Sequence, residues 1–170
     1  MGRMTELVPG ANAPLPQGPV LVRLSGPFDL CALVVSAHGK VDGDGDFVFY
    51  NQPRAAGVTL AGGEVTVDPA ALRPGADRVV IMASPEDGTT PFGQLPAPVV
   101  TLHNGRGSVL VHFAPPPLTR ETVLTLVEIY RRGPGWKVRA VGQGYADGLA
   151  GLARDYGVAG SRRCSPRWSC

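Results

Sequence analysis

Short apolar runs rich in Val recur along the whole chain, and Gly, Pro, Asp and Asn separate them. Because β-branched and aromatic residues favour strands and these turn residues end them, each run predicts a strand. Nine such runs are present, at 20–24, 30–36, 47–50, 64–67, 78–83, 98–102, 108–113, 122–131 and 136–141. A spacing of about 8–12 residues between short strands is typical of an all-β, two-sheet β-sandwich.

The last two runs alternate apolar and polar positions most clearly, and side chains of a strand alternate between its faces. One face of 122–131 is expected to carry Val123, Thr125, Val127 and Ile129. One face of 136–141 is expected to carry Trp136, Val138 and Ala140. The Gly-Pro-Gly sequence at 133–135 predicts a hairpin between these strands, and the Asn-Gly pair at 104–105 predicts another turn.

One α-helix is expected after the last strand. Its apolar face would consist of Tyr145, Leu149, Leu152, Ala153 and Tyr156, whose spacing follows a period of 3.6 residues. Asp147 is a suitable N-cap for this helix, and Gly157 suits its C-terminal end. A further helical turn is expected at 68–72, where Pro69 stands at the first helical position. Long helices do not alternate with the strands, so the sequence excludes nucleotide-binding α/β folds and α/β barrels.

The composition agrees with one folded domain that has many turns. Of the 170 residues, 44% are hydrophobic and 18% are charged, which excludes an ordinary disordered chain. The 23 glycines and 17 prolines lie between the apolar runs, where turns are expected. The net charge of +2 depends on Arg162, Arg163 and Arg167, without which the chain is net −1. We therefore expect a sandwich domain at 1–159, a flexible basic tail at 160–170 and no nucleic-acid partner.

Several classes of protein are disfavoured by what the sequence lacks. The longest strongly apolar run, 30–35, is far too short to span a membrane. Residues 2–18 carry no apolar stretch typical of a signal peptide, so a cytoplasmic location is expected. The three cysteines have no metal-binding spacing, and Cys31, inside an apolar run, is expected to be a buried, inert thiol. Because the sequence offers no nucleophile–base pair, we expect no enzymatic activity.

The acidic cluster of Asp42, Asp44 and Asp46 is the one concentration of carboxylates in the chain. Carboxylates at alternating loop positions can bind calcium, which takes six to eight oxygen ligands. A solvated turn uses the same residue types, so a plain turn remains an alternative. The EF-hand pattern fails, since Phe47 stands where that loop needs Gly. Asp29 would join the cluster only if a hairpin brought it alongside.

Four stretches resemble the TerD family, the tellurium-resistance and general stress proteins of bacteria. Residues 44–52 (Asp-Gly-Asp-Phe-Val-Phe-Tyr-Asn-Gln) are similar to the family's signature, and 28–30 (Phe-Asp-Leu) to its first acidic strand. Residues 92–94 (Phe-Gly-Gln) resemble its central motif, and 130–152 resemble its C-terminal hairpin and helix. The resemblance covers about residues 5–158 and implies a two-sheet β-sandwich.

The same resemblance implies calcium binding. Matched residue by residue, it offers as ligands Asp29, Asp44, Asp46 and Asn51. Two departures reduce this set: Cys31 stands where the family has a carboxylate, and only Glu64 remains where the family carries a dense acidic loop. Because calcium affinity follows the number of charged ligands and the rigidity of the site, we expect a single weak site or none.

The expected function follows from this reduced ligand set. We interpret the chain as a non-enzymatic stress-response or tellurium-resistance protein that acts as a protein-interaction module, with calcium binding weak or lost. The alternative is a calcium-responsive binding module that uses Asp29, Asp44 and Asp46. The expected partners are proteins, including other stress-response proteins, and the sequence leaves the oligomeric state open.

Overall fold

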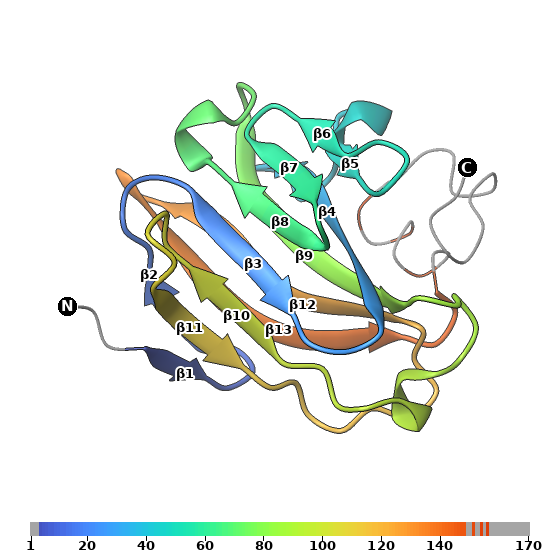
Figure 1. Cartoon of the computed structure of the whole chain (residues 1–170). Helices are drawn as coiled ribbons and strands as arrows, with labels where there is room; N and C mark the ends of the chain where they lie inside the picture. Colours follow the sequence, from blue (N-terminus) through green and yellow to red (C-terminus); the bar gives the residue numbers. More distant parts are fainter. Residues whose placement is uncertain (1–3, 149–150, 152–153, 155, 157–170) are drawn as a thin grey trace.

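The computed structural model describes residues 4–148, 151, 154 and 156, and within them the chain forms thirteen strands in two sheets (Figure 1). The seven-stranded sheet has the order β1 (Thr5–Leu7), β11 (Val109–Phe113), β10 (Val100–His103), β3 (Val20–Leu24), β8 (Glu64–Val67), β7 (Val58–Ala61) and β6 (Arg54–Ala55). The six-stranded sheet has the order β2 (Asn12–Pro14), β13 (Gly135–Tyr145), β12 (Val123–Arg132), β9 (Ala76–Pro85), β4 (Phe28–Ser36) and β5 (Phe47–Val48). Neighbouring strands are antiparallel, except that β1 runs parallel to β11.

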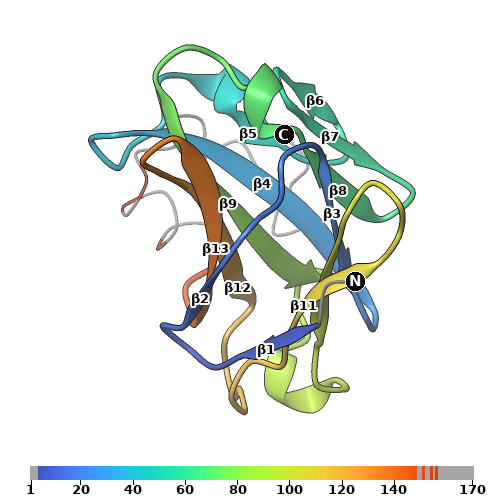
Figure 2. The same ribbon diagram turned by 90° about the vertical axis from the view of Figure 1, so that its left-hand side faces the viewer.

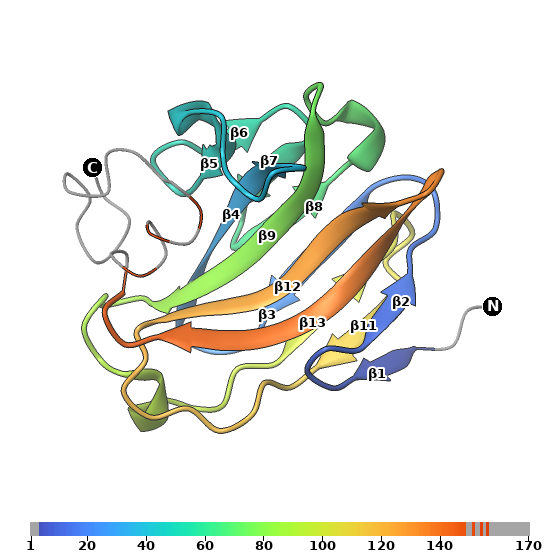
Figure 3. The same ribbon diagram turned by 180° about the vertical axis from the view of Figure 1, so that it is seen from behind.

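The two sheets pack face to face and enclose the main hydrophobic core (Figures 1 and 3). The seven-stranded sheet contributes Val22 and Leu102 to it, and the six-stranded sheet contributes Ile81, Ile129 and Val138, all fully buried. Burial of these apolar side chains supplies the main driving force for folding. The β-sandwich that the strand spacing predicted is therefore confirmed.

Strand β4 is buried on both of its faces. Alternate residues point into the main core, namely Leu30, Ala32 and Val34. The residues between them join a second buried cluster on the opposite face, namely Cys31, Leu33 and Val35. A strand buried on both sides reads as a continuous apolar run rather than an alternating one, which explains the sequence of 30–35. The expectation that Cys31 is a buried free thiol is confirmed.

The strand count and one face assignment differ from the sequence predictions. Among the described residues there are thirteen strands rather than about nine, because β1, β2, β6 and β7 have only two to four residues each. In β12, a β-bulge shifts the register between Thr125 and Val127. Val123 therefore belongs to the second cluster, whereas Val127 and Ile129 belong to the main core. The prediction that these residues share one face is wrong.

The predicted turns lie where the sequence placed them. Residues 133–134 connect β12 to β13, and residues 104–108 connect β10 to β11. Asp68 precedes the short 3₁₀ helix η2 (Pro69–Ala71), which matches the expected helical turn. The predicted C-terminal helix is not shown: Tyr145, its expected first apolar residue, ends strand β13, and most of its other residues lie outside the described part of the chain. The expected tail at 160–170 also lies outside it.

No helix within the described ranges is long and apolar enough to cross a membrane.

The chain passes between the two sheets several times, and two of these crossings concern the ends of the sandwich. At the N-terminus, β1 lies at the edge of one sheet and β2 at the edge of the other (Figure 2). Ala140 of β13 donates its N–H to the Ala11 carbonyl (2.9 Å) and accepts the N–H of Gly10 (2.8 Å), which holds this crossing in place. The second crossing, 68–75, runs from β8 to β9 and includes η2. It carries Arg73 to the end of β4, where the acidic loop begins.

Candidate functional site

The acidic loop connects β4 to β5 and turns through the short 3₁₀ helix η1 (Asp44–Asp46). Gly43 is fully extended just before η1, and its carbonyl accepts the N–H of Asp46 (3.1 Å). This turn directs the Asp46 side chain inward, where only 8% of it is exposed. A buried carboxylate is stable only with a charged or hydrogen-bonding partner, so its contacts decide what the loop can do.

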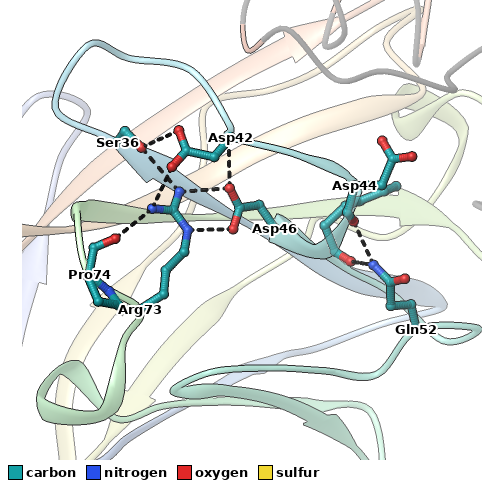
Figure 4. Close-up of polar contacts among 8 residues, drawn as sticks. Ser36, Asp42, Asp44, Asp46, Gln52, Arg73 and Pro74 are labelled. Atoms are coloured by element: carbon teal, nitrogen blue, oxygen red, sulfur yellow. Dashed lines mark hydrogen bonds and ion pairs between the residues drawn. The ribbon is translucent and has the colours of Figure 1, made fainter.

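Asp46 receives a bidentate ion pair from Arg73 of the β8–β9 crossing (Figure 4). Arg73 Nε donates to Asp46 Oδ1 at 2.6 Å, and Nη2 donates to Oδ2 at 2.7 Å. The main-chain N–H of Asp42 also donates to Oδ2, at 2.7 Å. Both carboxylate oxygens of Asp46 are therefore engaged by donors from within the protein.

The remaining donors of Arg73 are also used (Figure 4). Its Nη1 lies 3.1 Å from Asp42 Oδ2 and donates to the Pro74 carbonyl at 3.1 Å. Its Nη2 donates to Ser36 Oγ at 3.2 Å, and the Ser36 hydroxyl donates to Asp42 Oδ1 at 2.9 Å. The hydrogen bond to Asp46, together with the negative charges of Asp46 and Asp42, raises the pKa of Arg73 against the opposing effect of burial. The result is a closed polar network around one guanidinium.

Asp44 and Asn51 lie outside this network. The Asp44 side chain is exposed and points away from Arg73 (Figure 4). Its main-chain carbonyl accepts a hydrogen bond from Nε2 of Gln52 at 2.7 Å, and the same amide donates to the Phe47 carbonyl at 2.6 Å. Asn51 is exposed in the turn that follows β5. Of the predicted ligands, the structure therefore presents Asp44 and Asn51 to solvent and turns Asp46 inward.

Asp29 lies at the other end of β4 from the acidic loop. In the β4–β5 pairing Leu33 is opposite Phe47, so Asp46 is level with Val34, five residues from Asp29. Five residues of strand span about 17 Å. Oxygens that share one calcium ion lie within about 5 Å of each other, because each is 2.3–2.6 Å from the ion. The hairpin therefore forms, but it does not bring Asp29 to Asp46.

The rest of the acidic side chains do not complete a ligand set. Glu64, the remaining acid of the downstream loop, lies on the seven-stranded sheet and pairs with Arg23 at 3.0 Å. Among the described residues, no group of three or more His, Cys, Asp or Glu side chains is placed to hold a metal ion. The sequence identified the acidic loop but missed Arg73 and Ser36. No local pattern points to Arg73, which lies 27 residues from Asp46, and Ser36 is simply the last residue of an apolar strand.

The motif at 92–94 has a structural role. It forms the 3₁₀ helix η3 (Phe92–Gln94), and the Phe92 ring is almost fully buried and stacks on Phe28 with centroids 5.1 Å apart. A Cβ added to Gly93 would lie 2.6 Å from the Thr119 carbonyl oxygen, so only glycine fits here. The motif packs the loop before β10 against the loop before β12.

An open cleft of about 650 Å³ lies next to the Arg73 network. It lies between parts of the segments 15–18, 69–75 and 131–136, and its described lining residues include two arginines, Arg73 and Arg131, and no carboxylate. One of these arginines, Arg131, stacks its guanidinium 4.7 Å from the centre of the Trp136 ring. The other is Arg73, whose charge is directed toward the acidic loop. This end of the sandwich therefore presents a partly apolar, partly cationic surface.

Comparisons with known proteins give this geometry its context. A family model described as TerD domain matches residues 24–156. Tellurium resistance protein TerD from Alcaligenes sp is 34% identical over 152 residues, which cover 79% of each sequence. General stress protein 16U from Bacillus subtilis is 29% identical over 149 residues, which cover 77% of each sequence. Among solved structures, a homologue of telluride resistance protein from Streptomyces coelicolor shares the fold, with a TM-score of 0.54 at 19% identity over 76% of this chain and 91% of that one.

Proposed function

Because the chain belongs to the TerD family, we propose that it acts in the bacterial response to tellurium or general stress as a non-enzymatic protein-interaction module in the cytoplasm. In this proposal calcium binding is lost, or is too weak for millimolar calcium to stabilise the fold. The main support for this proposal is that Arg73 binds both oxygens of the Asp46 carboxylate. Because Arg73 neutralises the buried charge of Asp46, the loop needs no metal ion to fold. We therefore assign the function to the surface of the sandwich.

The alternative is a calcium-responsive module that uses Asp29, Asp44 and Asp46. It would require Asp46 to leave Arg73 and Asp29 to approach from about 17 Å along β4. Exposed Asp44 is the ligand that calcium could reach without breaking a contact, since its hydrogen bond with Gln52 uses only the main chain. One exposed carboxylate with solvent oxygens gives weak binding at most.

Asp44→Asn separates these two functions more cleanly than a change at Asp46, because it removes a candidate ligand without touching the Arg73 network. Melting temperatures of the wild type and Asp44→Asn are measured in a chelator and in about 5 mM calcium, enough to load a millimolar site. Under the proposed function calcium does not change the melting temperature of the wild type or of Asp44→Asn. Wild-type stabilisation by calcium that Asp44→Asn abolishes would establish the calcium module instead.

The cellular role is tested in a bacterial strain that lacks this chain and shows reduced survival in tellurite. Expression of the wild type should restore survival, and Asp44→Asn should restore it equally. A cross-linking experiment in the same strain should recover the wild-type chain joined to other proteins. Survival that depends on Asp44, or a chain that forms no protein contacts during tellurite stress, would contradict the proposal.

A further inference from the structure

We propose that the Arg73 guanidinium is the resident cation of the acidic loop and excludes a divalent metal ion from it. This inference deepens the proposed function and rests on it, because it names the group that makes the loop independent of calcium. It concerns Ser36, Asp42, Asp46 and Arg73, which come from three separate segments of the chain.

Arg73 already occupies the carboxylate oxygens that a metal ion would need. Every nitrogen of the guanidinium contacts an oxygen of the network: Nε and Nη2 contact Asp46, and Nη1 contacts Asp42. The ion pair with Asp46 is bidentate, the geometry in which a planar guanidinium matches a carboxylate best. A calcium ion would need these same oxygens at 2.3–2.6 Å, so it could bind only after Arg73 had left.

The positive charge of Arg73 also opposes the binding of a metal ion. Asp42 and Asp46 together carry two negative charges, and Arg73 neutralises one of them while sitting between them. The charge that remains is nearest Asp42, whose side chain is 57% exposed and therefore solvated. An incoming divalent ion would meet a fixed positive charge a few ångströms away, which opposes its binding.

The ion pair between Arg73 and Asp46 links two segments that are far apart in the sequence. Arg73 belongs to the 68–75 crossing from β8 to β9, and Asp46 belongs to the loop that follows β4. The ion pair therefore joins the two segments, a task that bound metal ions commonly perform in acidic loops. Removing the guanidinium leaves a buried carboxylate without its cation, which strongly destabilises a protein.

The test compares the wild type with Arg73→Met, which keeps much of the side-chain volume and removes the charge. In a chelator, Arg73→Met should lower the melting temperature by roughly 2–12 °C, because Asp46 is buried but Arg73 is only partly so, which places the cost between those of a surface pair and a buried pair. About 5 mM calcium should restore part of this loss in Arg73→Met and should not shift the wild type. Arg131→Met, in the same cleft but paired with Trp136, is the matched control and should respond to calcium no more than the wild type.

A double variant keeps the inference testable if Arg73→Met does not fold. Asp46→Asn combined with Arg73→Met removes both charges, so it should fold and show no response to calcium. The inference is overturned if Arg73→Met gains no more from calcium than the wild type, if it is as stable as the wild type, or if the double variant is no more stable than Arg73→Met. A calcium response of the wild type itself would instead refute the proposed function, so the two failures are distinguishable.

Discussion

Replacing Gly57 with alanine should destabilise the protein far more than a substitution in a short turn normally does. Gly57 lies between β6 and β7 with φ +78°, a conformation that residues with a Cβ rarely adopt. A Cβ built there would lie 2.7 Å from the Leu72 nitrogen, 2.8 Å from the Asp68 carbonyl oxygen and 2.9 Å from the Ala71 carbonyl carbon. The turn therefore packs directly on the backbone of η2, next to the residue that precedes Arg73.

The magnitude has two parts. The left-handed conformation costs about 1–2 kcal/mol for a residue with a Cβ. Contacts below 3.0 Å with main-chain atoms force the backbone to move, which adds about 1–3 kcal/mol. Gly62→Ala is the matched control, because Gly62 has φ +59° and a Cβ added to it would have nothing within 4 Å. It should therefore show the conformational part of the cost and no steric part.

The assay is equilibrium unfolding in urea, followed by tryptophan fluorescence. With a slope of about 2 kcal/mol per molar urea, the midpoint of Gly57→Ala should lie about 0.5–1.5 M below that of Gly62→Ala. Equal midpoints for the two variants would refute the reasoning, since they would show that the approach of the turn to η2 costs nothing. Equal slopes are required for the comparison, because a changed slope would mean a changed unfolded or native state.

Three further predictions concern other parts of the fold. With the other two cysteines replaced by serine, Cys31 should react with a thiol reagent at least about 10³-fold more slowly in the native than in the unfolded protein. The reason is that burial, and secondarily the charge of Asp29, raise the pKa of its thiol, and rapid labelling of the native protein would contradict this. The hydrogen bond from the Thr119 N–H lowers the pKa of the Glu121 carboxyl. The wild type should therefore be more stable than Glu121→Gln at pH 7, and this advantage should disappear as the pH falls from 4.5 through the lowered pKa of Glu121. A stability difference between the two proteins that does not vary with pH would refute this prediction. Phe92→Ala should lower the free energy of unfolding by about 3–5 kcal/mol in the same urea assay, and a loss below about 1 kcal/mol would show that the buried ring contributes little.

The fold class could be predicted from the sequence because strand formation and turn formation are largely local. Val-rich runs predicted nine of the thirteen strands among the described residues and missed β1, β2, β6 and β7, which have two to four residues each. The hairpins at 104–108 and 133–134 were predictable because Gly, Asn and Pro fix the backbone of a turn regardless of what surrounds it. The β-bulge at Thr125–Val127 was not, because a single extra residue leaves the apolar pattern intact while reversing which face each side chain occupies.

The candidate site was only half determined by the sequence. Asp42, Asp44 and Asp46 are visible as a loop of carboxylates, since all three lie within five residues. Tertiary structure determined the different surroundings of these side chains: Asp46 turns inward to Arg73, 27 residues away, while Asp44 faces solvent. The physical reason is that a local sequence pattern specifies which residues favour strands or turns and which positions alternate between the faces of a strand. An ion pair between distant residues depends instead on where the chain crosses between the sheets. The sequence alone thus predicted an acidic loop in a sandwich, and only the course of the 68–75 crossing past the end of β4 determined which cation that loop holds.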